Sequence, residues 1–296
     1  MPRAGIVTVV GKPNVGKSTL LNRIIGQKLS ITSSKPQSTR DRIVGIRSDD
    51  DVQMVILDTP GLLEPRYELQ RAMRATALRA LDDADVIVYM VDAHDSAPPP
   101  LAEAAGLERS PAAPIITAFN KIDSLDHEAR QALLARTADD DTLVPISAAS
   151  GDGVERLLAH IARLLPESPF LYPEDEIGTQ SLRFFTSELI RETALEQLEE
   201  EVPYSVACEV EEFREERRPV YIRAVIYVER PTQKQILIGR KGERIREIGR
   251  AARVKIEELV GSPVYLDLWV KVLANWRRNA KALRRFGYKP PEETAS

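Results

Sequence analysis

A glycine-rich segment near the start of the chain has the residue types and spacing of a phosphate-binding loop. Residues 11–18 read GKPNVGKS, which matches the pattern GxxxxGK(S/T). The apolar run 6–10 precedes them and helical apolar spacing follows, which is the strand–loop–helix context that this pattern needs. Backbone N–H groups of such a loop surround phosphates at a helix N-terminus. We therefore expect Lys17 to reach the β- and γ-phosphates and the Ser18 hydroxyl to bind Mg²⁺.

An aspartate at the end of a second apolar run is expected to complete the metal site. Residues 55–61 read VILDTPG. At the carboxyl end of a strand, Asp58 can hold a water bound to Mg²⁺, and the N–H of Gly61 can sense a γ-phosphate. The next position is Leu62, where Ras-like proteins carry the glutamine that orients the attacking water. Leucine has no hydrogen-bonding group, so we expect slow intrinsic hydrolysis, with the water positioned by backbone, a second switch or a monovalent cation.

A third segment is suited to selecting the base. Residues 120–123 read NKID and follow the apolar run 115–119. The carboxylate of Asp123 can accept hydrogen bonds from both N1–H and the 2-amino group of guanine, a pair of donors that adenine does not offer. The backbone of Ser147-Ala148, after the last apolar run of this half, can meet the guanine O6. The sequence therefore predicts GTP and GDP as ligands.

Strand-like and helical segments alternate through the first half of the chain. Strands are expected at 6–10, 43–48, 52–57, 86–91, 115–119 and 143–146. Helices are expected at 18–25, 68–82 and 154–164. This alternation predicts an α/β fold with a doubly wound, mostly parallel sheet, whose ligands lie beyond the carboxyl ends of the strands.

The second half has a different pattern. Prolines and acidic residues cluster at 166–177, which is typical of a linker. The expected order is then a helix (182–200), two strands (204–213 and 219–229), a short helix (233–238), a glycine loop, a helix to about 260, a strand (263–272) and a basic helix through 276–286. This order predicts a separate α+β domain.

The glycine loop of the second half could bind a nucleic-acid backbone. Residues 239–242 read GRKG. Two glycines let the backbone lie against a sugar–phosphate chain, Arg240 and Lys241 supply charge, and Ile238 and Ile245 can floor a groove for unstacked bases. Alone, GxxG is equally typical of a tight helix–turn–helix corner. Its place between two helices of this α+β pattern favours the nucleic-acid interpretation.

The charge distribution supports the same interpretation. The chain has 296 residues and a net charge of -4, which by itself gives no sign of a nucleic-acid partner. Residues 1–180 hold 19 basic and 26 acidic side chains, whereas residues 234–290 hold 15 basic and 5 acidic side chains, a net charge of +10. Such a basic stripe predicts an anionic partner for the second half.

Together these motifs resemble those of the translation-factor-related GTPases. Asn14 in the phosphate loop and the segment 35–40, KPQSTR, are similar to the Era family, whose usual Thr-Thr pair is here Ser38-Thr39. Residues 181–272 resemble a type II KH domain, a module that clamps about four nucleotides of a single strand. A GTPase domain followed by such a domain is the Era arrangement, and the resemblance covers essentially the whole chain.

The resemblance carries further expectations. It implies that Thr39 lies on a switch loop and completes the Mg²⁺ shell, and that K⁺ bound near Asn14 assists hydrolysis. It also implies a bacterial ribosome-assembly GTPase that binds the single-stranded 3′ end of 16S ribosomal RNA in the 30S subunit. We expect a cytoplasmic monomer, whose route to the inner face of the cell membrane would be peripheral contact through the basic stripe.

The expected domains are a GTPase domain at 1–170, a linker at 171–180 and a KH domain with a basic carboxy-terminal helix at 181–296. Catalytic roles are expected for Lys17, Thr39, Asp58 and Gly61, and metal contacts for Ser18, Thr39 and Asp58. Nucleotide contacts are expected from Gly11, Lys12, Pro13, Asn14, Val15, Gly16, Lys17, Ser18, Thr19, Asp58, Thr59, Pro60, Gly61, Leu62, Asn120, Lys121, Ile122, Asp123, Ser147, Ala148 and Ala149. RNA contacts are expected from Ile238, Gly239, Arg240, Lys241, Gly242 and Ile245.

Three other functions fit these motifs less well. A GTPase of tRNA modification would carry a reactive cysteine motif at its carboxy terminus, but the single cysteine here is Cys208. A tandem-GTPase ribosome factor would have two phosphate loops, and this chain has one. A passive RNA-binding module with a dead nucleotide site conflicts with intact Lys17, Ser18, Asp58 and Asp123.

The two tryptophans and an acidic helix carry minor expectations. Trp269 is expected in the core, whereas Trp276, beside two arginines, could equally be a core residue or an RNA contact. The acidic stretch 192–201 is expected to be a solvated helix face. Widely spaced histidines and a single cysteine exclude a zinc site of ordinary spacing and a disulfide framework.

Overall fold

The chain forms two compact units in the computed structural model, which describes residues 1–33, 35–95 and 97–290. The first unit comprises Met1–Arg66 and Gln70–Thr179, and the second comprises Tyr67–Leu69 and the chain from Gln180 on. Most of the expected linker is tied to the first unit. The side-chain carbonyl of Gln53 accepts hydrogen bonds from two backbone N–H groups in this segment, Leu171 at 2.7 Å and Tyr172 at 2.9 Å.

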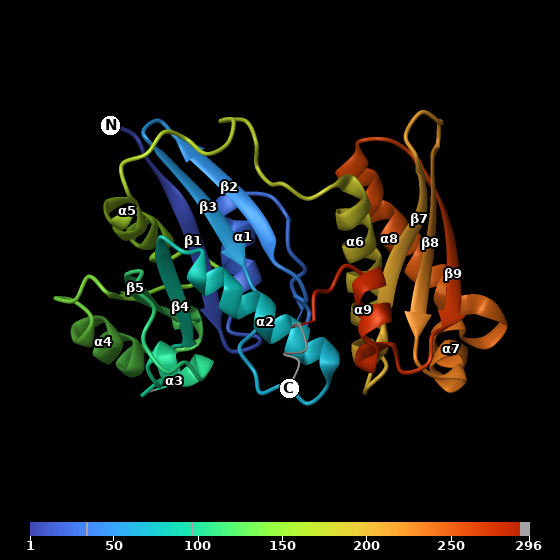
Figure 1. Cartoon of the computed structure of the whole chain (residues 1–296), viewed down its shortest axis with the longest axis horizontal. Coiled ribbons are helices and arrows are strands. Elements are labelled where there is room, and N and C mark those ends of the chain that lie inside the picture. Colours follow the sequence, from blue (N-terminus) through green and yellow to red (C-terminus); the bar gives the residue numbers. More distant parts are fainter. Residues whose placement is uncertain (34, 96, 291–296) are drawn as a thin grey trace, which may run out of the picture. The chain divides into compact units, whose positions relative to one another are not determined.

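The first unit is built on a six-stranded sheet with the order β2-β3-β1-β4-β5-β6 (Figure 1). Its strands are β1 Arg3–Gly11, β2 Ile43–Asp49, β3 Val52–Asp58, β4 Val86–Asp92, β5 Ile115–Asn120 and β6 Leu143–Pro145. All neighbours are parallel except β2 and β3, which form an antiparallel hairpin. The predicted α/β fold with a mostly parallel sheet is confirmed.

Helices cover both faces of this sheet. Neighbouring residues of a strand point to opposite faces, and the buried strands carry apolar residues on both. The helices are α1 Lys17–Ile25, α2 Glu68–Asp82, α3 Leu101–Ala105, α4 His127–Arg136 and α5 Val154–Leu164, with a 3₁₀ turn, η1, at Ile122–Ser124. On β2, Val44 and Ile46 pack with Ala80 of α2. Gly45 between them faces α1, where an added Cβ would lie 2.6 Å from Leu21 Cδ1. The sequence did not predict α4, whose first turn is capped by the side chain of Asp126.

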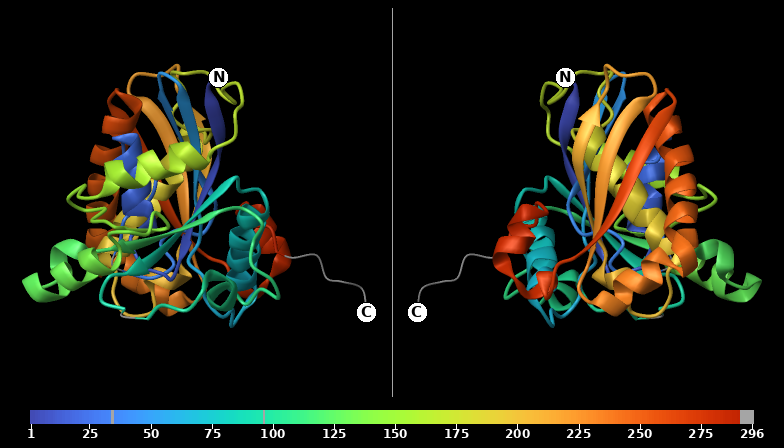
Figure 2. Two further views of the ribbon diagram at one scale, coloured as in Figure 1. Left: turned by 90° about the vertical axis from the view of Figure 1, so that its left-hand side faces the viewer. Right: turned by 90° about the vertical axis from the view of Figure 1, so that its right-hand side faces the viewer.

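The second unit has a three-stranded sheet with the order β7-β8-β9. Its elements are α6 Leu182–Gln197, η2 Pro203–Ser205, β7 Ala207–Arg214, β8 Val220–Val228, α7 Pro231–Ile238, η3 Arg240–Gly242, α8 Glu243–Val260, β9 Val264–Val272, η4 Trp276–Arg278 and α9 Ala280–Arg285. Strand β8 runs antiparallel to β7 and parallel to β9. In the right panel of Figure 2, the sheet lies between α8 on one side and α9 on the other.

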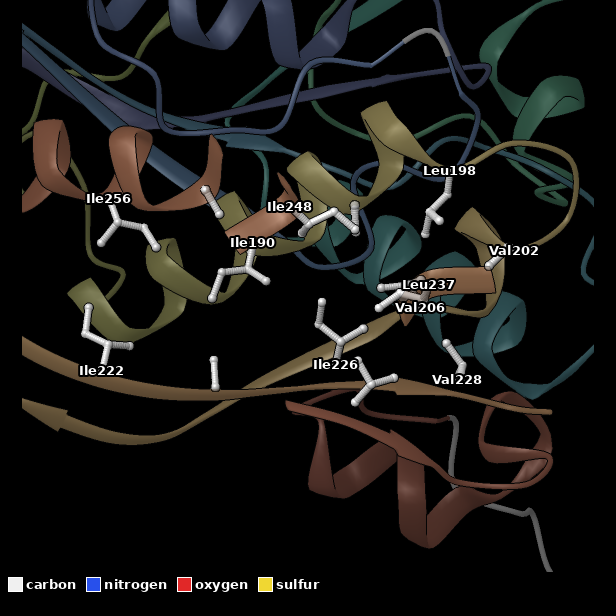
Figure 3. Packing of buried hydrophobic residues seen from close by; sticks show 14 of the residues in the cluster. Ile190, Leu198, Val202, Val206, Ile222, Ile226, Val228, Leu237, Ile248 and Ile256 are labelled. Atoms are coloured by element: carbon white, nitrogen blue, oxygen red, sulfur yellow. The ribbon is translucent and has the colours of Figure 1, made fainter. Parts of the chain in front are cut away.

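The core of the second unit lies between the sheet and the helices α6 and α8 (Figure 3). Ile190 of α6 and Ile248 of α8 are fully buried against Ile222 and Ile226, alternate residues of β8. The expected solvated acidic face of α6 is partly wrong. Glu192 is fully buried and pairs with Lys255 of α8 at 3.1 Å.

The prediction of a single basic helix through 276–286 is also wrong. A 3₁₀ turn, η4, and a short helix, α9, replace it, because the Asn279 side chain between them accepts a hydrogen bond from the Ala282 N–H and caps α9. Trp276 is fully buried, its Nε1–H donates to the Ser205 carbonyl at 2.8 Å, and its ring meets Phe286 edge-on at 5.2 Å. Of its two predicted roles, Trp276 therefore takes the core one.

Trp269 was predicted to be a core residue, and this is wrong. Its side chain is 55% exposed, because it lies on the face of β9 that points away from α6 and α8. Leu268 and Val270, its neighbours along the strand, pack into the core instead. Within the described residues, no helix is both long and apolar enough to cross a membrane.

The two tryptophans make a matched test of this packing. Replacing buried Trp276 with alanine removes a large ring and a buried hydrogen bond, so Trp276→Ala should lower the free energy of unfolding by about 3–5 kcal/mol. Trp269→Ala removes an exposed ring and should cost about 0.5 kcal/mol or less. Urea unfolding followed by far-ultraviolet circular dichroism measures both. Equal losses would contradict the placement of the two side chains.

Candidate nucleotide site and RNA groove

The phosphate loop connects β1 to α1 and holds Lys17 at the start of that helix. The Lys17 ammonium group donates to the carbonyls of Gly11 at 3.2 Å and Lys12 at 3.0 Å. Gly16 has a positive φ of 103°, and a Cβ there would lie 2.2 Å from the side-chain amide nitrogen of Asn120. Glycine is therefore required at this position, both for the backbone conformation and for the close approach of Asn120.

Two opposite charges are buried at the carboxyl end of the sheet. Lys17 is 6% exposed and Asp58 is 0% exposed. Burial lowers the pKa of Lys17 to about 8, although the negative charge of Asp58 opposes this shift. Burial raises the pKa of Asp58, against the effects of Lys17 and of hydrogen bonds from nearby hydroxyls. Both shifts reflect the cost of removing these charges from water, a cost that a phosphate beside Lys17 and a metal ion beside Asp58 would offset.

Hydroxyl groups surround the Asp58 carboxylate. Ser18 and Ser30 donate to Asp58 Oδ2 at 2.7 and 2.8 Å, and Thr39 does so at 3.4 Å. Ser18 and Thr39 are also within 2.8 Å of each other. The other carboxylate oxygen, Asp58 Oδ1, is buried and has no hydrogen-bond partner among the described residues.

This set of oxygens fits Mg²⁺. Hydroxyl and carboxylate oxygens with an unsatisfied lone pair are ligands that Mg²⁺ accepts, and it takes its remaining ligands from phosphates and water. Over the ranges that the structure describes, no three His, Cys, Asp or Glu side chains gather as ligands for a metal. The predicted metal residues Ser18, Thr39 and Asp58 are thus brought together, and a metal ion held by them would need phosphate and water to complete its shell.

A cleft of about 100 Å³ lies above the phosphate loop. It is lined by Pro13, Asn14, Gly16, Lys17, Ser18, Thr19, Ile31, Thr32, Ser33, Gln37, Ser38, Thr39 and Gly61. The structure therefore places the first motif, the segment around Thr39 and Gly61 of the second motif around one cavity.

The second motif packs directly against the phosphate loop. A Cβ on Gly61 would lie 2.7 Å from the backbone nitrogen of Pro13, so only glycine fits here. The Leu62 N–H donates to the Gly11 carbonyl at 2.9 Å, and its side chain is 7% exposed in the core. The Leu62 side chain therefore points away from the cleft, which supports the expectation that it does not orient water.

Asn120 joins the phosphate loop to the predicted base loops. Its side chain is 3% exposed, donates to the Val15 carbonyl at 2.7 Å and accepts from the Ala148 N–H at 2.8 Å. Asp123, three residues further on, is exposed and is carried on η1, where its carboxylate can meet a base. Ser147 and Ala148 are buried, whereas Ala149 is exposed.

Asp92 is a residue of this site that the sequence analysis missed. It ends β4 and accepts a hydrogen bond from the Lys121 ammonium group at 2.7 Å. Burial opposes the shift, but hydrogen bonds from Lys121 and His94 lower the pKa of Asp92 to about 2. Ser30 was missed as well. The sequence contained one signal for Asp92, which stands at the end of a predicted buried strand as Asp58 does, and none for Ser30.

The GRKG loop of the second unit is sharply bent. Gly239, Lys241 and Gly242 all have positive φ, at 73°, 50° and 79°. Arg240 and Lys241 are exposed at the tip of the loop. Ile238 and Ile245, the expected groove floor, pack partly buried against the core of the unit.

A groove of about 330 Å³ runs between α8 and β9 beside this loop. Arg246, Arg250 and Arg253 lie at helical spacing along α8 and line it together with Gly249. Its remaining lining residues are Ile245, Val264, Tyr265, Leu266 and Leu268. An apolar floor with a row of arginines suits unstacked bases and their phosphates. Of these lining residues only Ile245 was predicted from the sequence, because only the fold brings β9 beside α8.

Two domain families match the chain. Residues 6–121 match the model of a family described as 50S ribosome-binding GTPase, and residues 201–277 match a KH domain model. A phosphate loop after β1, an aspartate at the end of β3 and a base-loop motif that begins at the end of β5 define a P-loop GTPase. Here it is followed by a KH domain whose helix and strand order is type II.

Whole-chain relatives narrow this class to one family. The chain is 45% identical to GTPase Era of Marinobacter nauticus, over 96% of this chain and 95% of that one. It is 44% identical to GTPase Era of Carboxydothermus hydrogenoformans, over 97% and 98% of the two chains. The chain belongs to the Era family of GTPases, as its motifs suggested, and it is accordingly a GTPase.

Solved structures agree with this assignment. A crystal structure of Era in complex with MgGDPNP and nucleotides 1506–1542 of 16S ribosomal RNA matches with a TM-score of 0.90 and 39% identity. It covers 97% of this chain and 99% of that one. A structure of Aquifex aeolicus Era bound to GDP and AlF₄⁻ matches with a TM-score of 0.89 at the same identity.

The lowered pKa of Lys17 predicts a pH dependence of nucleotide affinity. In the free protein Lys17 loses its proton as the pH rises through about 8, whereas bound phosphates would keep it protonated. GTP affinity should therefore be constant below pH 7.5 and fall about tenfold between pH 7 and 9, as measured by equilibrium binding of a fluorescent GTP analogue.

Lys17→Arg is the matched control, because arginine stays charged throughout this range. Its weaker binding should be nearly independent of pH, and titration of the guanine base itself would affect both proteins alike. A wild-type affinity that is flat between pH 7 and 9 would contradict the role assigned to the buried Lys17.

Proposed function

We propose that this protein binds and hydrolyses GTP with Mg²⁺ and binds the 3′ end of 16S ribosomal RNA through its KH groove during assembly of the 30S subunit. One observation carries the proposal. The same chain contains a nucleotide cleft, with Lys17, Ser18 and Asp58 brought together, and an arginine-lined groove beside a GxxG loop. The Era structure solved with MgGDPNP and 16S ribosomal RNA supports this pairing of ligands.

The proposed nucleotide contacts follow from the cleft. Lys17 and the loop N–H groups hold the β- and γ-phosphates, and Asp123 holds the guanine base. Ser18, Thr39 and Asp58 hold the Mg²⁺, which when bound neutralises charge on the phosphates. Gly61 packs against Pro13 of the phosphate loop, and we propose that its N–H contacts the γ-phosphate. With Leu62 in the core, the water would be oriented by backbone groups, a second switch or a monovalent cation, so we expect slow turnover.

The choice of the small subunit depends on the whole-chain relatives. The GTPase family model carries a description that names the 50S ribosome, but it covers only residues 6–121. The Era relatives extend over nearly the whole chain, and the solved Era complex contains 16S ribosomal RNA. The KH groove lies outside residues 6–121, so the whole-chain relatives, and not the GTPase family model, support RNA of the small subunit as its ligand.

Three finer expectations stay predictions. Potassium is proposed to bind near Asn14, which has a positive φ of 61° and lines the nucleotide cleft. The protein is proposed to act as a monomer in the cytoplasm. Any contact with the inner face of the cell membrane is proposed to be peripheral, through the basic residues of the second unit.

A substitution in the GxxG loop tests the RNA half of the proposal. Gly242 has a φ of 79°, and a Cβ there would meet nothing closer than 3.9 Å. Gly242→Asp therefore adds a negative charge to the loop with little steric cost. Affinity for single-stranded RNA of the 16S 3′ end should fall at least about tenfold, measured by fluorescence anisotropy, while GTP affinity should stay unchanged.

Gly261→Asp is the matched control. Gly261 also ends a turn of the second unit with positive φ, 66°, and a Cβ there would meet nothing within 4 Å. It should therefore carry the same backbone strain without the loss of RNA affinity. If both variants bind RNA equally well, the GxxG loop does not contact RNA and this half of the proposal fails.

A further inference from the structure

The sheet of the second unit has a second face that carries exposed aromatic side chains. This face points away from α6 and α8, and α9 covers part of it (Figure 3). There Tyr227 is 3% exposed and contacts Phe286. Beyond α9, Tyr265 is 59% and Trp269 55% exposed. Large apolar rings at such exposure on a packed sheet are typical of a binding surface.

The rings lie in register on neighbouring strands. Tyr221 of β8 pairs with Tyr265 of β9, and their rings stack with centroids 5.8 Å apart and planes 12° apart. Trp269 lies four residues further along β9, about 13 Å away at the usual rise of a strand. We call the three side chains Tyr221, Tyr265 and Trp269 the aromatic platform.

Neighbouring groups hold the Tyr221 ring of the platform in place. The Tyr221 hydroxyl donates to Asp267 Oδ2 at 3.0 Å, and the Arg214 guanidinium lies 5.4 Å from the centre of the Tyr221 ring. Arg223 pairs with the same Asp267 at 3.0 Å, and its guanidinium lies 5.8 Å from the centre of the Tyr221 ring. The Tyr221 ring, and the Tyr265 ring stacked on it, therefore lose little further freedom when a ligand binds against them.

The basic side chains around the platform are paired with acids. Arg223 pairs with Asp267, Lys271 with Glu211 at 3.0 Å, and Arg285 with Glu209 at 2.7 Å. This face of the sheet therefore presents exposed aromatic rings, and the positive charges around them are neutralised by acidic partners. Exposed rings among neutralised charges are better suited to stacking with the bases of a nucleic acid than to binding its phosphates.

The platform is continuous with the KH groove. Tyr265 lines the groove and stacks in the platform, and β9 is the edge strand between the two. Leu266 and Leu268 line the groove side of β9, whereas Trp269 lies on the opposite side. A strand of RNA that leaves the groove across this edge would meet the rings of the platform.

We propose that the aromatic platform stacks unpaired bases of the RNA strand that leaves the KH groove. This inference rests on the proposed function, because the groove must hold RNA first. It extends the single-stranded RNA site beyond the four nucleotides that a KH groove clamps. The groove supplies phosphate contacts through its arginines, and the platform adds stacking that tolerates any base.

Tryptophan fluorescence reports directly on the platform. The chain has two tryptophans, of which Trp276 is fully buried and Trp269 is exposed. The probes are a ten-nucleotide single-stranded RNA from the 16S 3′ end and its four-nucleotide pieces. We expect the ten-nucleotide RNA to quench Trp269 emission and the best-binding four-nucleotide piece to leave it nearly unchanged.

Affinities of three proteins complete the test. Trp269→Ala should weaken binding of the ten-nucleotide RNA about 5- to 100-fold, leave the four-nucleotide piece unaffected and keep the slope of log Kd against log salt. Trp269→Phe, which keeps a ring, should recover most of the lost affinity. Arg250→Ala, in the groove, should instead weaken both RNAs and reduce the salt slope by about 0.7.

Each result has a defined meaning. If the four-nucleotide piece binds but Trp269→Ala leaves the ten-nucleotide affinity unchanged, the platform does not bind RNA, and the proposed function stands. The platform proposal also fails if Trp269→Ala weakens both RNAs equally, since that indicates a structural effect. If the wild-type protein binds neither RNA, the proposed function fails and the platform proposal fails with it.

Discussion

The burial of two opposite charges, Lys17 and Asp58, is the constraint on which the nucleotide site depends. Removing charges from water is costly unless partners replace the water, and here the partners come from several segments. Carbonyls of the phosphate loop accept hydrogen bonds from the Lys17 ammonium group, and three hydroxyls donate hydrogen bonds to one oxygen of Asp58. Its other oxygen is left without a partner among the described residues. A ligand that brings both phosphate and a metal ion completes this arrangement, which is what MgGTP offers.

The parallel sheet explains how distant segments reach this one place. Strands β1, β3, β4 and β5 all end at the same edge, so Gly11, Asp58, Asp92 and Asn120 meet there although they are far apart in the chain. Asn120 then ties the phosphate loop to the segment around Ala148 with two buried hydrogen bonds. The same principle acts in the second unit, where β9 returns beside α8 and forms the groove.

Local patterns predicted the motifs and most elements, because each motif carries its own strand or helix signal. What the sequence did not reveal depends on contacts between elements. Trp269 has apolar neighbours in sequence and Trp276 has polar ones, yet Trp276 is the buried ring, because it contacts Phe286 whereas Trp269 lies on the face of β9 that points away from the core. Ser30 and Asp92 lack a motif of their own and become site residues through Asp58 and Lys121. Helix α4 was missed because it is mostly exposed and has no apolar stripe to reveal it.

The most direct test of the central claim is the choice of base by Asp123. In Asp123→Asn the carboxylate becomes an amide, which can donate to the 2-oxo group of xanthine but cannot accept both guanine protons. Equilibrium binding should show at least about a tenfold loss of GTP affinity and a preference for xanthosine triphosphate. Asp126→Asn, in the same exposed segment, should bind like the wild type because asparagine also caps a helix. An Asp123→Asn protein that still prefers GTP would contradict the assignment of this chain's site to guanine nucleotides.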